Sequence, residues 1–559
     1  MTDARGPAPD AWADYVIVGA GSAGCVLANR LSAGGRHNVA VLEAGGDDRP
    51  GRHLLNPAQA ASTLNIHLPA GFTRMLKDGR VNWNYLTEAD PGTGGRQHVF
   101  PRGKVLGGSS SINGMLWVRG LPEDYERWGQ MGLAGWNWAE AERYFHRIER
   151  QHGAGESAGE GEGLLDIGDV PMQHPMFDAM AQAFAEAGAP VSTDLNGTTR
   201  EGVARVRVNI RKGRRVSAAT AYLHPAMGRA NLRVLTHAHA ARVLFEGRRA
   251  VGVEYERAGQ RQVIRARREV ILAGGTINSP QLLELSGIGA VERLAALGIA
   301  VVANSPRVGE NLQDHFAAMV RARLKPGTPS LNELSRGGAL LGQLLRLAFT
   351  GTGLLALGGS NLTAFLKSDG ALDLPDLQFF ASPATVDFEA LARDGAMTME
   401  RQPGMTVGGY VMRPQSVGSI HLRSADFREA PAIRPNFLAH EADCRAQVAC
   451  LRIARKVMAT PVLAPFFDHE LTPGAALESD ADLLAFARAS GSTGYHQTST
   501  CAMGAGVEAV VSGALKVNGV AGLRVADASV MPFVVSGNTN AATMMIAEKA
   551  ADLILAEAG

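Results

Sequence analysis

The sequence predicts an α/β fold (α+β overall), in which a discontinuous Rossmann-like domain alternates with pieces of a second domain built on an antiparallel sheet. The first observation is the order of elements at the N-terminus. A β-branched run at 15–18 is followed by a glycine-rich turn at 19–24, a helical pattern at 25–31 and a second strand at 39–42. Strand, helix and strand in this order form a βαβ unit, which implies a parallel sheet.

The second observation is that similar strands recur far along the chain. An apolar run at 269–272 leads through two glycines into a helix expected to begin around Ser279 and Pro280, and another at 523–526 precedes a long helix expected over 540–556. The third observation is the alternation of apolar and polar residues at 406–424, which is typical of antiparallel strands. A run rich in Gly, Glu and Ser at 153–163 predicts a surface loop.

These patterns predict two discontinuous domains. A chain of 559 residues is longer than the ~100–200 residues of one domain. The nucleotide-binding domain is expected to comprise residues 12–59, 96–120, 231–316 and 505–559. The second domain, which should shape the substrate pocket, is expected to comprise residues 60–95, 121–230 and 317–504, with His496 on a strand at the interface.

Composition excludes several classes of partner. Lys and Arg number 55 and Asp and Glu 54, so a net charge of +1 gives no field that would capture nucleic acid. Hydrophobic residues make up 46%, enough for a large core. None of the four cysteines forms a C-x-x-C pair, so no metal site or redox dithiol is expected, and a reducing compartment is favoured. With no secretion leader apparent, we expect a cytoplasmic location, with at most peripheral contact to the inner membrane.

An apolar stretch at 337–357 needs its own explanation. A transmembrane helix requires ~20 mostly apolar residues. Gln343, Arg346 and several glycines interrupt this one. We expect it to be buried or to cover a pocket, and contact with a membrane interface is the alternative.

The N-terminal turn has the pattern Gly19-x-Gly21-x-x-Gly24. The first glycine permits the turn, the second lets backbone N–H groups approach a pyrophosphate, and the third lets the helix pack on the strand. Glu43 lies at the end of the second strand, where its carboxylate can accept hydrogen bonds from ribose hydroxyls. The motif therefore indicates a dinucleotide site but does not separate FAD from NAD.

A second polar loop is expected at 103–113. Two glycines and three serines stand in a row at 107–111, and such a run forms neither a good strand nor a good helix interior. Its N–H and hydroxyl groups could surround a polar ligand, although an ordinary turn would have the same composition.

With later motifs, this loop resembles the glucose–methanol–choline (GMC) oxidoreductase family over nearly the whole chain. Residues 103–120 resemble the family's first signature and residues 275–289 its second. The runs at 308–315 and 522–529 are also typical of the family. Within it, the chain is most similar to bacterial choline-dehydrogenase-like and sorbose-dehydrogenase-like members.

The resemblance implies FAD as the cofactor, with the pyrophosphate at the first glycine turn and the isoalloxazine against the loop at 107–113. Some members attach FAD covalently through a histidine at the position of Ile112, so the resemblance implies non-covalent FAD here. At Ala240 relatives often have Val, but that contact with the adenine is made by the backbone. The implied cofactor-binding residues are Gly19, Gly21, Ser22, Ala23, Gly24, Glu43, Ala44, Gly103, Val105, Gly107, Ser109, Asn113, Met115, Leu116, Ala240, Asp527, Ala528, Asn538 and Thr539.

The resemblance also implies a catalytic pair near the C-terminus. His496 matches the catalytic histidine of the family's active-site strand, and Asn538 takes the second catalytic position. The chemistry agrees, because a histidine is the natural base for an alcohol proton at neutral pH and an amide can hold the alcohol oxygen without adding charge. His315 has a structural place in the family and is left out of the catalytic set. Cys501 is expected to be a packed thiol.

The function expected from these residues is oxidation of a small-molecule alcohol to a carbonyl by hydride transfer to FAD. The electron acceptor is oxygen or a quinone or other redox carrier, and a dehydrogenase is favoured over an oxidase. A non-redox hydroxynitrile lyase on the same fold is an alternative. A light-driven decarboxylase is disfavoured because His496 is present and Met412 stands where that class has a cysteine. A binding module is disfavoured because the catalytic pair is retained. The sequence leaves the oligomeric state open.

The substrate is expected to have an apolar or aromatic body. The run at 331–362 and the segment around Phe379 and Phe380 are apolar, and the sequence offers no evident set of carboxylates for a quaternary ammonium. A primary alcohol of this kind is therefore favoured over choline.

Overall fold

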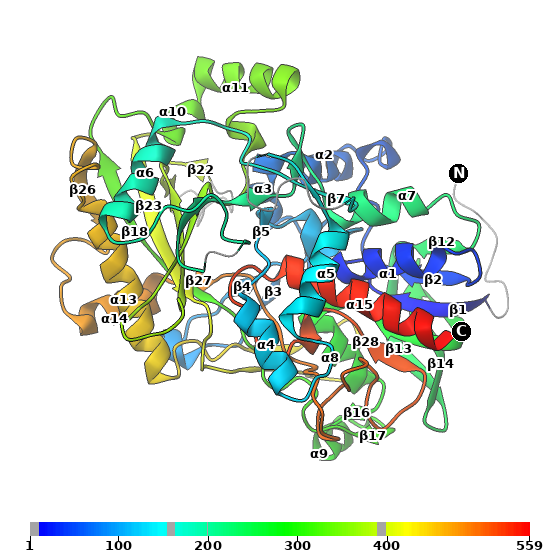
Figure 1. Cartoon of the computed structure of the whole chain (residues 1–559). Helices are drawn as coiled ribbons and strands as arrows, with labels where there is room; N and C mark the ends of the chain where they lie inside the picture. The colour runs from blue at the N-terminus through cyan, green and yellow to red at the C-terminus, as the bar shows by residue number, and fades with distance from the viewer. Residues whose placement is uncertain (1–10, 154–161, 198–199, 388–397, 559) are drawn as a thin grey trace.

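The computed structural model describes residues 11–153, 162–197, 200–387 and 398–558. Two seven-stranded sheets lie side by side in it, one mostly parallel and one antiparallel (Figure 1). This arrangement confirms the predicted fold class. Most of the loop predicted at 153–163 falls outside the described residues.

The first sheet joins strands from both ends of the chain. Its order is β12-β2-β1-β15-β14-β13, and β28 pairs with β15. Strand β15 pairs in parallel with β1 and β28 and antiparallel with β14. The strands are β1 (Ala11–Val18), β2 (Val39–Leu42), β12 (Leu232–Leu235), β13 (Ala238–Glu246), β14 (Arg249–Arg257), β15 (Gln260–Leu272) and β28 (Leu523–Val525).

Two helices from opposite ends of the sequence pack together beside this sheet. They are α1 (Ser22–Ser32), which follows the glycine turn, and α15 (Asn540–Ala558), which ends the described chain (Figure 1). Both were predicted. The contact brings the segment before α15, which holds Asn538, next to the turn before α1.

The helix predicted at Ser279 and Pro280 begins one turn earlier, as α8 (Gly275–Leu285). A proline inside a helix removes the hydrogen bond to the carbonyl four residues before it. Here that carbonyl belongs to Thr276, and it accepts a hydrogen bond from the Thr500 hydroxyl at 2.6 Å instead. The helix therefore continues through Pro280, and the predicted start is wrong.

The second sheet is antiparallel, in the order β26-β18-β23-β20-β19-β8, with β27 paired to β18. Its strands are β8 (Gly202–Arg205), β18 (Phe316–Leu324), β19 (Leu362–Leu366), β20 (Leu377–Ser382), β23 (Gly404–Val411), β26 (Phe467–Thr472) and β27 (Ser492–Thr493). Helices α6 (Pro175–Glu186), α13 (Glu441–Met458) and α14 (Asp480–Ser490) pack around it. The antiparallel strands predicted at 406–424 are confirmed as β23 and β24 (Ser419–His421).

The two sheets draw their strands from different parts of the chain. The first uses segments within 11–42, 232–272 and 523–525, and the second uses segments within 202–205, 316–411 and 467–493. On this observation rests our proposal that the chain is divided into two discontinuous domains with the boundaries expected from the sequence.

Short elements connect and cover the sheets. The remaining α-helices are α2 (Pro57–His67), α3 (Phe72–Met75), α4 (Pro122–Gln130), α5 (Trp138–Ile148), α7 (His224–Ala226), α9 (Val291–Ala296), α10 (Leu331–Leu334) and α11 (Gly337–Thr350). Single helical turns are η1 (Pro50–Arg52), η2 (Pro69–Gly71), η3 (Pro91–Thr93), η4 (Gly108–Ser111), η5 (Ala219–Leu223), η6 (Leu354–Ala356) and η7 (Ala528–Val530). Two-stranded ribbons are β3 (Tyr85–Leu86) with β4 (Val99–Phe100), β5 (Leu116–Trp117) with β9 (Arg207–Val208), β6 (Glu149–Gln151) with β7 (Leu165–Ile167), β10 (Ile210–Arg211) with β11 (Arg214–Arg215), β16 (Ile288–Gly289) with β17 (Ala303–Asn304), β21 (Val386–Asp387) with β22 (Thr398–Met399), and β24 with β25 (Ala432–Arg434).

The apolar stretch at 337–357 forms α11 and η6 at the top of the molecule (Figure 1). The expectation that it is buried is wrong for α11, because no residue of this helix is buried. The expectation that it covers a pocket is confirmed, since Leu340 and Leu344 line the main cavity. Within the described part of the chain, none of the helices has the length and apolar character needed to cross a bilayer.

Candidate active site

A cavity of about 1280 Å³ runs between the two sheets. It begins at the carboxyl ends of the parallel strands, where Val18, Leu42 and Leu272 line it, and reaches His496 and Asn538. Ligands of open α/β sheets bind at this edge. Pockets for drug-sized ligands measure ~300–1,000 Å³, so the cavity can hold a dinucleotide together with a small substrate.

The glycine turn before α1 has the geometry that a pyrophosphate requires. The backbone of Gly19 has φ +101°, which favours glycine. A Cβ at Gly24 would lie 1.9 Å from the Gly19 carbonyl oxygen, so α1 can approach the end of β1 only because residue 24 has no side chain. A Cβ at Gly21 would meet no protein atom closer than 4.0 Å, and this residue faces the cavity. No side chain caps α1 and no acid stands in its first turn. Its N-terminal N–H groups are therefore available to an anion.

Glu43 lies beside this turn and is held in place by backbone donors. Its carboxylate accepts hydrogen bonds from the N–H of Ala20 at 2.9 Å and of Gly45 at 2.7 Å. Burial raises the pKa of Glu43 to about 7, and the two backbone donors oppose that rise. The side chain lines the cavity, where it can accept hydrogen bonds from ribose hydroxyls.

The loop at 107–113 forms the adjoining wall around η4. A Cβ at Gly108 would lie 2.6 Å from the Cα of Gly21, so the loop approaches the glycine turn closely. Asn113 is fixed by its own Oδ1, which accepts hydrogen bonds from Met115 N at 3.1 Å and from the buried Arg215 at 2.7 Å. The loop thus presents an ordered polar surface to the cavity.

Most of the sequence-predicted cofactor residues line this one cavity. Those that do are Gly19, Gly21, Ser22, Ala23, Glu43, Ala44, Gly103, Ser109, Asn113, Met115, Leu116, Ala240, Asp527, Ala528, Asn538 and Thr539. Three others lie behind the wall: Gly24 packs on Gly19, Val105 is buried in an apolar cluster with Ile112, and Gly107 donates its N–H to the Ala20 carbonyl. The contact of these three residues with FAD stays a prediction.

Asp527 connects the end of β28 to the start of α8. One of its carboxylate oxygens accepts from Gly275 N at 2.8 Å and from the Ser279 hydroxyl at 2.6 Å, and the other accepts from Ser529 N at 2.8 Å. The carboxylate therefore caps the start of α8 while its residue lines the cavity. This contact explains why the motifs at 275–289 and 522–529 occur together.

The catalytic candidates His496 and Asn538 line the same cavity. His496 follows β27, and its backbone N–H donates to the carboxylate of Asp314 at 2.8 Å. Asn538 lies in the turn before α15, and its Nδ2 is 2.9 Å from Nε2 of His496. The two residues expected to act together are thus in direct contact.

A chain of hydrogen bonds sets the protonation pattern of His496. The Met412 carbonyl can only accept, so Nε2 of His315 donates to it at 2.8 Å, and Nδ1 of a neutral His315 must then accept. This Nδ1 lies 2.9 Å from Nδ1 of His496, which therefore carries the proton. The free lone pair of His496 is left on Nε2, which faces Asn538.

The hydrogen bonds on the other side of Asn538 give the same orientation of donors and acceptors. The buried Tyr410 hydroxyl donates to Oε1 of Gln378, and Nε2 of Gln378 donates to Oδ1 of Asn538 at 3.3 Å. Nδ2 of Asn538 is then directed at His496. Donors and acceptors agree along the whole path, so both histidine tautomers and the amide orientation are determined.

Burial keeps both imidazoles neutral. Desolvation lowers the pKa of His496 well below 6.5, and the neighbouring His315 and Arg102 lower it further. Desolvation also lowers the pKa of His315 to about 3, so His315 stays an acceptor for His496 at neutral pH. The Tyr410 ring stacks on the His315 ring at 4.2 Å between centroids.

Sequence reasoning missed the residues that orient the pair. His315 was placed outside the catalytic set, and Gln378 and Tyr410 were not singled out. All four cysteines, Cys501 among them, are free and buried, as expected for packed thiols. Among the described residues no cluster of side chains suits a metal ion.

Comparisons with known proteins show the family to which the chain belongs. Two family models, both described as GMC oxidoreductase, match residues 13–317 and 414–547. Mitochondrial choline dehydrogenase of Mus musculus is 42% identical over 97% of this chain and 89% of that protein. Alcohol dehydrogenase [acceptor] of Pseudomonas putida is 39% identical over 97% of this chain and 95% of that protein.

Solved structures show the same likeness. Pyridoxine 4-oxidase from Mesorbium loti has a TM-score of 0.83 at 30% identity, covering 96% of this chain and 98% of that one. A formate oxidase of Aspergillus oryzae has a TM-score of 0.89 at 26% identity, covering 98% and 99%. The resemblance seen in the sequence motifs is confirmed, and the cradle described above fits the cofactor that the family uses. The chain belongs to the GMC oxidoreductase family, as an FAD-dependent enzyme that acts on the CH–OH group of its donors.

Proposed function

We propose that this chain oxidises an alcohol with an apolar body, with His496 as the general base and Asn538 as the residue that holds the alcohol oxygen. The observation that carries the proposal is the contact at 2.9 Å between Nε2 of His496 and Nδ2 of Asn538 in the cavity wall. The FAD of this family, when bound along the cavity, supplies the acceptor for the hydride. The protein must then remove one proton and exclude water.

A bound alcohol can replace the hydrogen bond between Asn538 and His496 by two hydrogen bonds, one to each residue. Its O–H donates to Nε2 of His496, and its oxygen accepts from Nδ2 of Asn538. As the carbon–hydrogen bond breaks, Nε2 takes the hydroxyl proton and the amide stabilises the negative charge that develops on oxygen. His315 keeps its acceptor toward Nδ1 of the newly charged imidazolium.

The cavity beside the catalytic pair is apolar. Phe72, Leu331, Leu354, Phe380 and Met399 line it. Among the described residues, the carboxylates that line the cavity are Glu43 and Asp527, both at the nucleotide end, whereas Arg321 and Arg336 line the substrate end. A quaternary ammonium would find no carboxylate partner there. We therefore favour a primary alcohol with an aliphatic or aromatic body over choline, although choline dehydrogenases are among the relatives.

The second half of the cycle is proposed to use an acceptor other than oxygen. Support comes from the relative named alcohol dehydrogenase [acceptor]. Relatives named oxygen-dependent choline dehydrogenase supply the competing expectation. A cytoplasmic location, with at most peripheral membrane contact, stays a prediction from the sequence.

The deciding experiment is anaerobic flavin bleaching with a panel of aliphatic and aromatic alcohols and choline, followed by reoxidation with oxygen or a quinone. Apolar primary alcohols should bleach the flavin faster than choline. His496→Ala should lower the bleaching rate by about 10²–10⁴-fold at normal FAD content, because it removes the proton acceptor. Asn538→Ala should lower it less. If no alcohol bleached the flavin, the proposal would fail and a lyase would become the better explanation. If His496→Ala kept the wild-type rate, His496 would not be the base and that part of the proposal would fail.

A further inference from the structure

Helix α11 carries an apolar face that no part of the described chain covers. Leu341, Leu345 and Phe349 are 59%, 52% and 84% exposed. Their spacing places them on one side of the helix. Folded monomers seldom gather large apolar side chains in this way unless the patch contacts a partner or a membrane.

Three segments around α11 contain no acidic residue, although the exposed Glu333 stands in α10, which contacts α11. The sequence contains no Asp or Glu in 49–77, 202–233 or 334–368, although acids and bases nearly balance over the whole chain. These segments hold η1 and α2, the ribbon β10–β11, and α11 with η6. The exposed basic residues that they contribute are Arg52, Arg74, Lys77, Arg211, Lys212, Arg214, Arg233 and Arg346.

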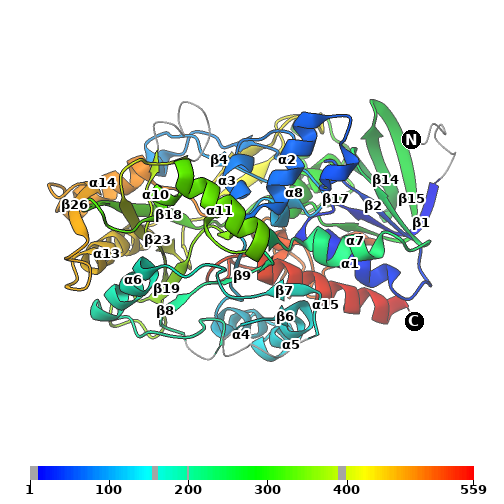
Figure 2. The same cartoon turned by 90° about the horizontal axis from the view of Figure 1, so that it is seen from above.

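The three segments meet on one side of the molecule. In Figure 1 α11 and α2 lie at the top, and both face the viewer in Figure 2. The turn at Lys212 and Gly213 packs against Gly351 at the end of α11, and β11 contacts α2. Apolar and basic side chains therefore share this face.

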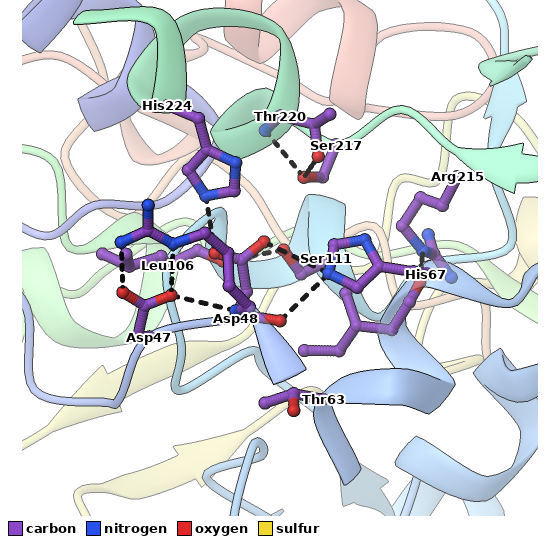
Figure 3. A network of polar contacts seen from close by, with 12 residues as sticks. Asp47, Asp48, Thr63, His67, Leu106, Ser111, Arg215, Ser217, Thr220 and His224 are labelled. Atoms are coloured by element: carbon purple, nitrogen blue, oxygen red, sulfur yellow. Dashed lines mark hydrogen bonds and ion pairs between the residues drawn. The ribbon is translucent and has the colours of Figure 1, made fainter. Parts of the chain in front are cut away.

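A buried polar network joins segments that border this face (Figure 3). Asp48 contacts His224 at 2.8 Å through its carboxylate and His67 at 3.0 Å through its carbonyl. Arg215 donates from β11 to the Ile66 carbonyl in α2 at 2.8 Å. These contacts fasten α2 to β11 and join α7 to the segment at Asp48.

The cavity also reaches this face. Leu344 of α11 and Arg74 of α3 are exposed, and both line the cavity. An apolar alcohol could enter between them. Leu345 and Phe349 do not line the cavity, so the exposed side of α11 is separate from the site.

We propose that this face docks on an anionic lipid bilayer, with α11 lying in the plane of the bilayer–water interface. Interfacial helices combine exposed apolar side chains with flanking Lys and Arg, and this face has both. Exposed cations on segments that contain no acid match the negative surface of anionic lipid, and each Lys or Arg near it strengthens binding roughly 5-fold. Delivery of apolar alcohols from lipid into the cavity rests on the proposed function, whereas the docking does not.

The test uses the flavin-loaded enzyme and sedimentation with phosphatidylcholine vesicles that either contain or lack phosphatidylglycerol. We expect binding only to the anionic vesicles, weakening as salt is added. Leu345→Glu combined with Phe349→Glu should abolish binding, and neutralising Arg211, Lys212 and Arg214 to Gln should weaken it by roughly 100-fold. Val507→Glu, at a residue that is 91% exposed outside this face, should bind like the wild type.

Two further measurements keep the outcomes apart. All variants should bleach their flavin with a water-soluble alcohol at the wild-type rate, so loss of vesicle binding is not loss of the enzyme. Phe349→Trp should show a blue-shifted emission on anionic vesicles that Val507→Trp lacks. The inference is overturned if anionic vesicles fail to bind or if the double variant binds them normally. It is also overturned if that variant instead converts a dimer to a monomer, which would identify a second copy as the occupant.

Discussion

Replacing Gln378 by Leu removes the residue that orients Asn538 without touching the cavity wall. Gln378 is buried behind the wall and donates to Oδ1 of Asn538 at 3.3 Å and to the Thr363 hydroxyl at 3.0 Å. Without that donor the Asn538 amide can turn over and present its oxygen to Nε2 of His496. Two acceptors would then face each other, and the amide would no longer hold an alcohol oxygen.

The size of the effect follows from the bond that is lost. A neutral hydrogen bond contributes ~0.5–1.5 kcal/mol net, so the rate of anaerobic flavin reduction should fall about 2- to 12-fold. The variant also leaves the buried Tyr410 hydroxyl without its acceptor, which costs ~1–3 kcal/mol of stability. Loss of rate and loss of stability therefore have different causes in the same variant.

A second substitution separates the two causes. Tyr410→Phe removes the stranded hydroxyl, so Gln378→Leu with Tyr410→Phe should regain most of the lost stability and keep the slow rate. Tyr410→Phe alone leaves the Gln378–Asn538 bond intact and should reduce its flavin at close to the wild-type rate. Stopped-flow bleaching at saturating alcohol measures the rate, and thermal unfolding measures stability. The reasoning fails if Gln378→Leu reduces its flavin at the wild-type rate, or if rate follows stability across the three variants.

Three further predictions concern the cofactor and the base. Gly21→Val should fold but lose FAD, because a Cβ there meets no protein atom closer than 4.0 Å and only the pyrophosphate would clash. Circular dichroism measures folding and flavin absorbance measures FAD content. A yellow variant would mean that the site is misplaced. Acid precipitation should release FAD into solution, because Ile112 offers no attachment nitrogen, and flavin retained in the pellet would contradict this. The rate of flavin reduction should be independent of pH near neutrality and fall only in acid, with a midpoint below the ordinary histidine pKa of 6.5. The reason is that burial lowers the pKa of His496 and the neutral form is the base. A midpoint above 6.5 would refute the assigned environment.

The sequence predicted those parts of the site that lie within short motifs. The turn at Gly19 to Gly24 and the residue Glu43 are local features of one βαβ unit, so their place at the strand ends follows from the order of elements. His496 and Asn538 were assigned from motif resemblance. Their contact joins the turn after β27 to the turn before α15, and the two residues are 42 positions apart in sequence.

What the sequence could not predict depends on pairing between distant segments. His315 and His496 are separated by 181 residues, and β18 pairing with β27 brings them together. Gln378 and Tyr410 face each other because β20 and β23 pair in that register. The apolar stretch at 337–357 was expected to be buried or to cover a pocket, and the exposure of α11 was not predicted, since burial is decided by what packs against a helix and periodicity does not reveal that.

A base with a depressed pKa raises a question that the hydrogen-bond chain answers. Lowering the pKa of His496 guarantees a free lone pair but weakens its affinity for a proton. Catalysis requires stabilisation that grows as the proton arrives. The lone pair of His315 and the Met412 carbonyl behind it supply this, because their interaction with Nδ1–H strengthens when His496 becomes positive. Desolvation and the hydrogen bonds of His315 and Met412 thus act at different moments. Desolvation keeps His496 unprotonated before the reaction, and the hydrogen bonds stabilise it once it is charged.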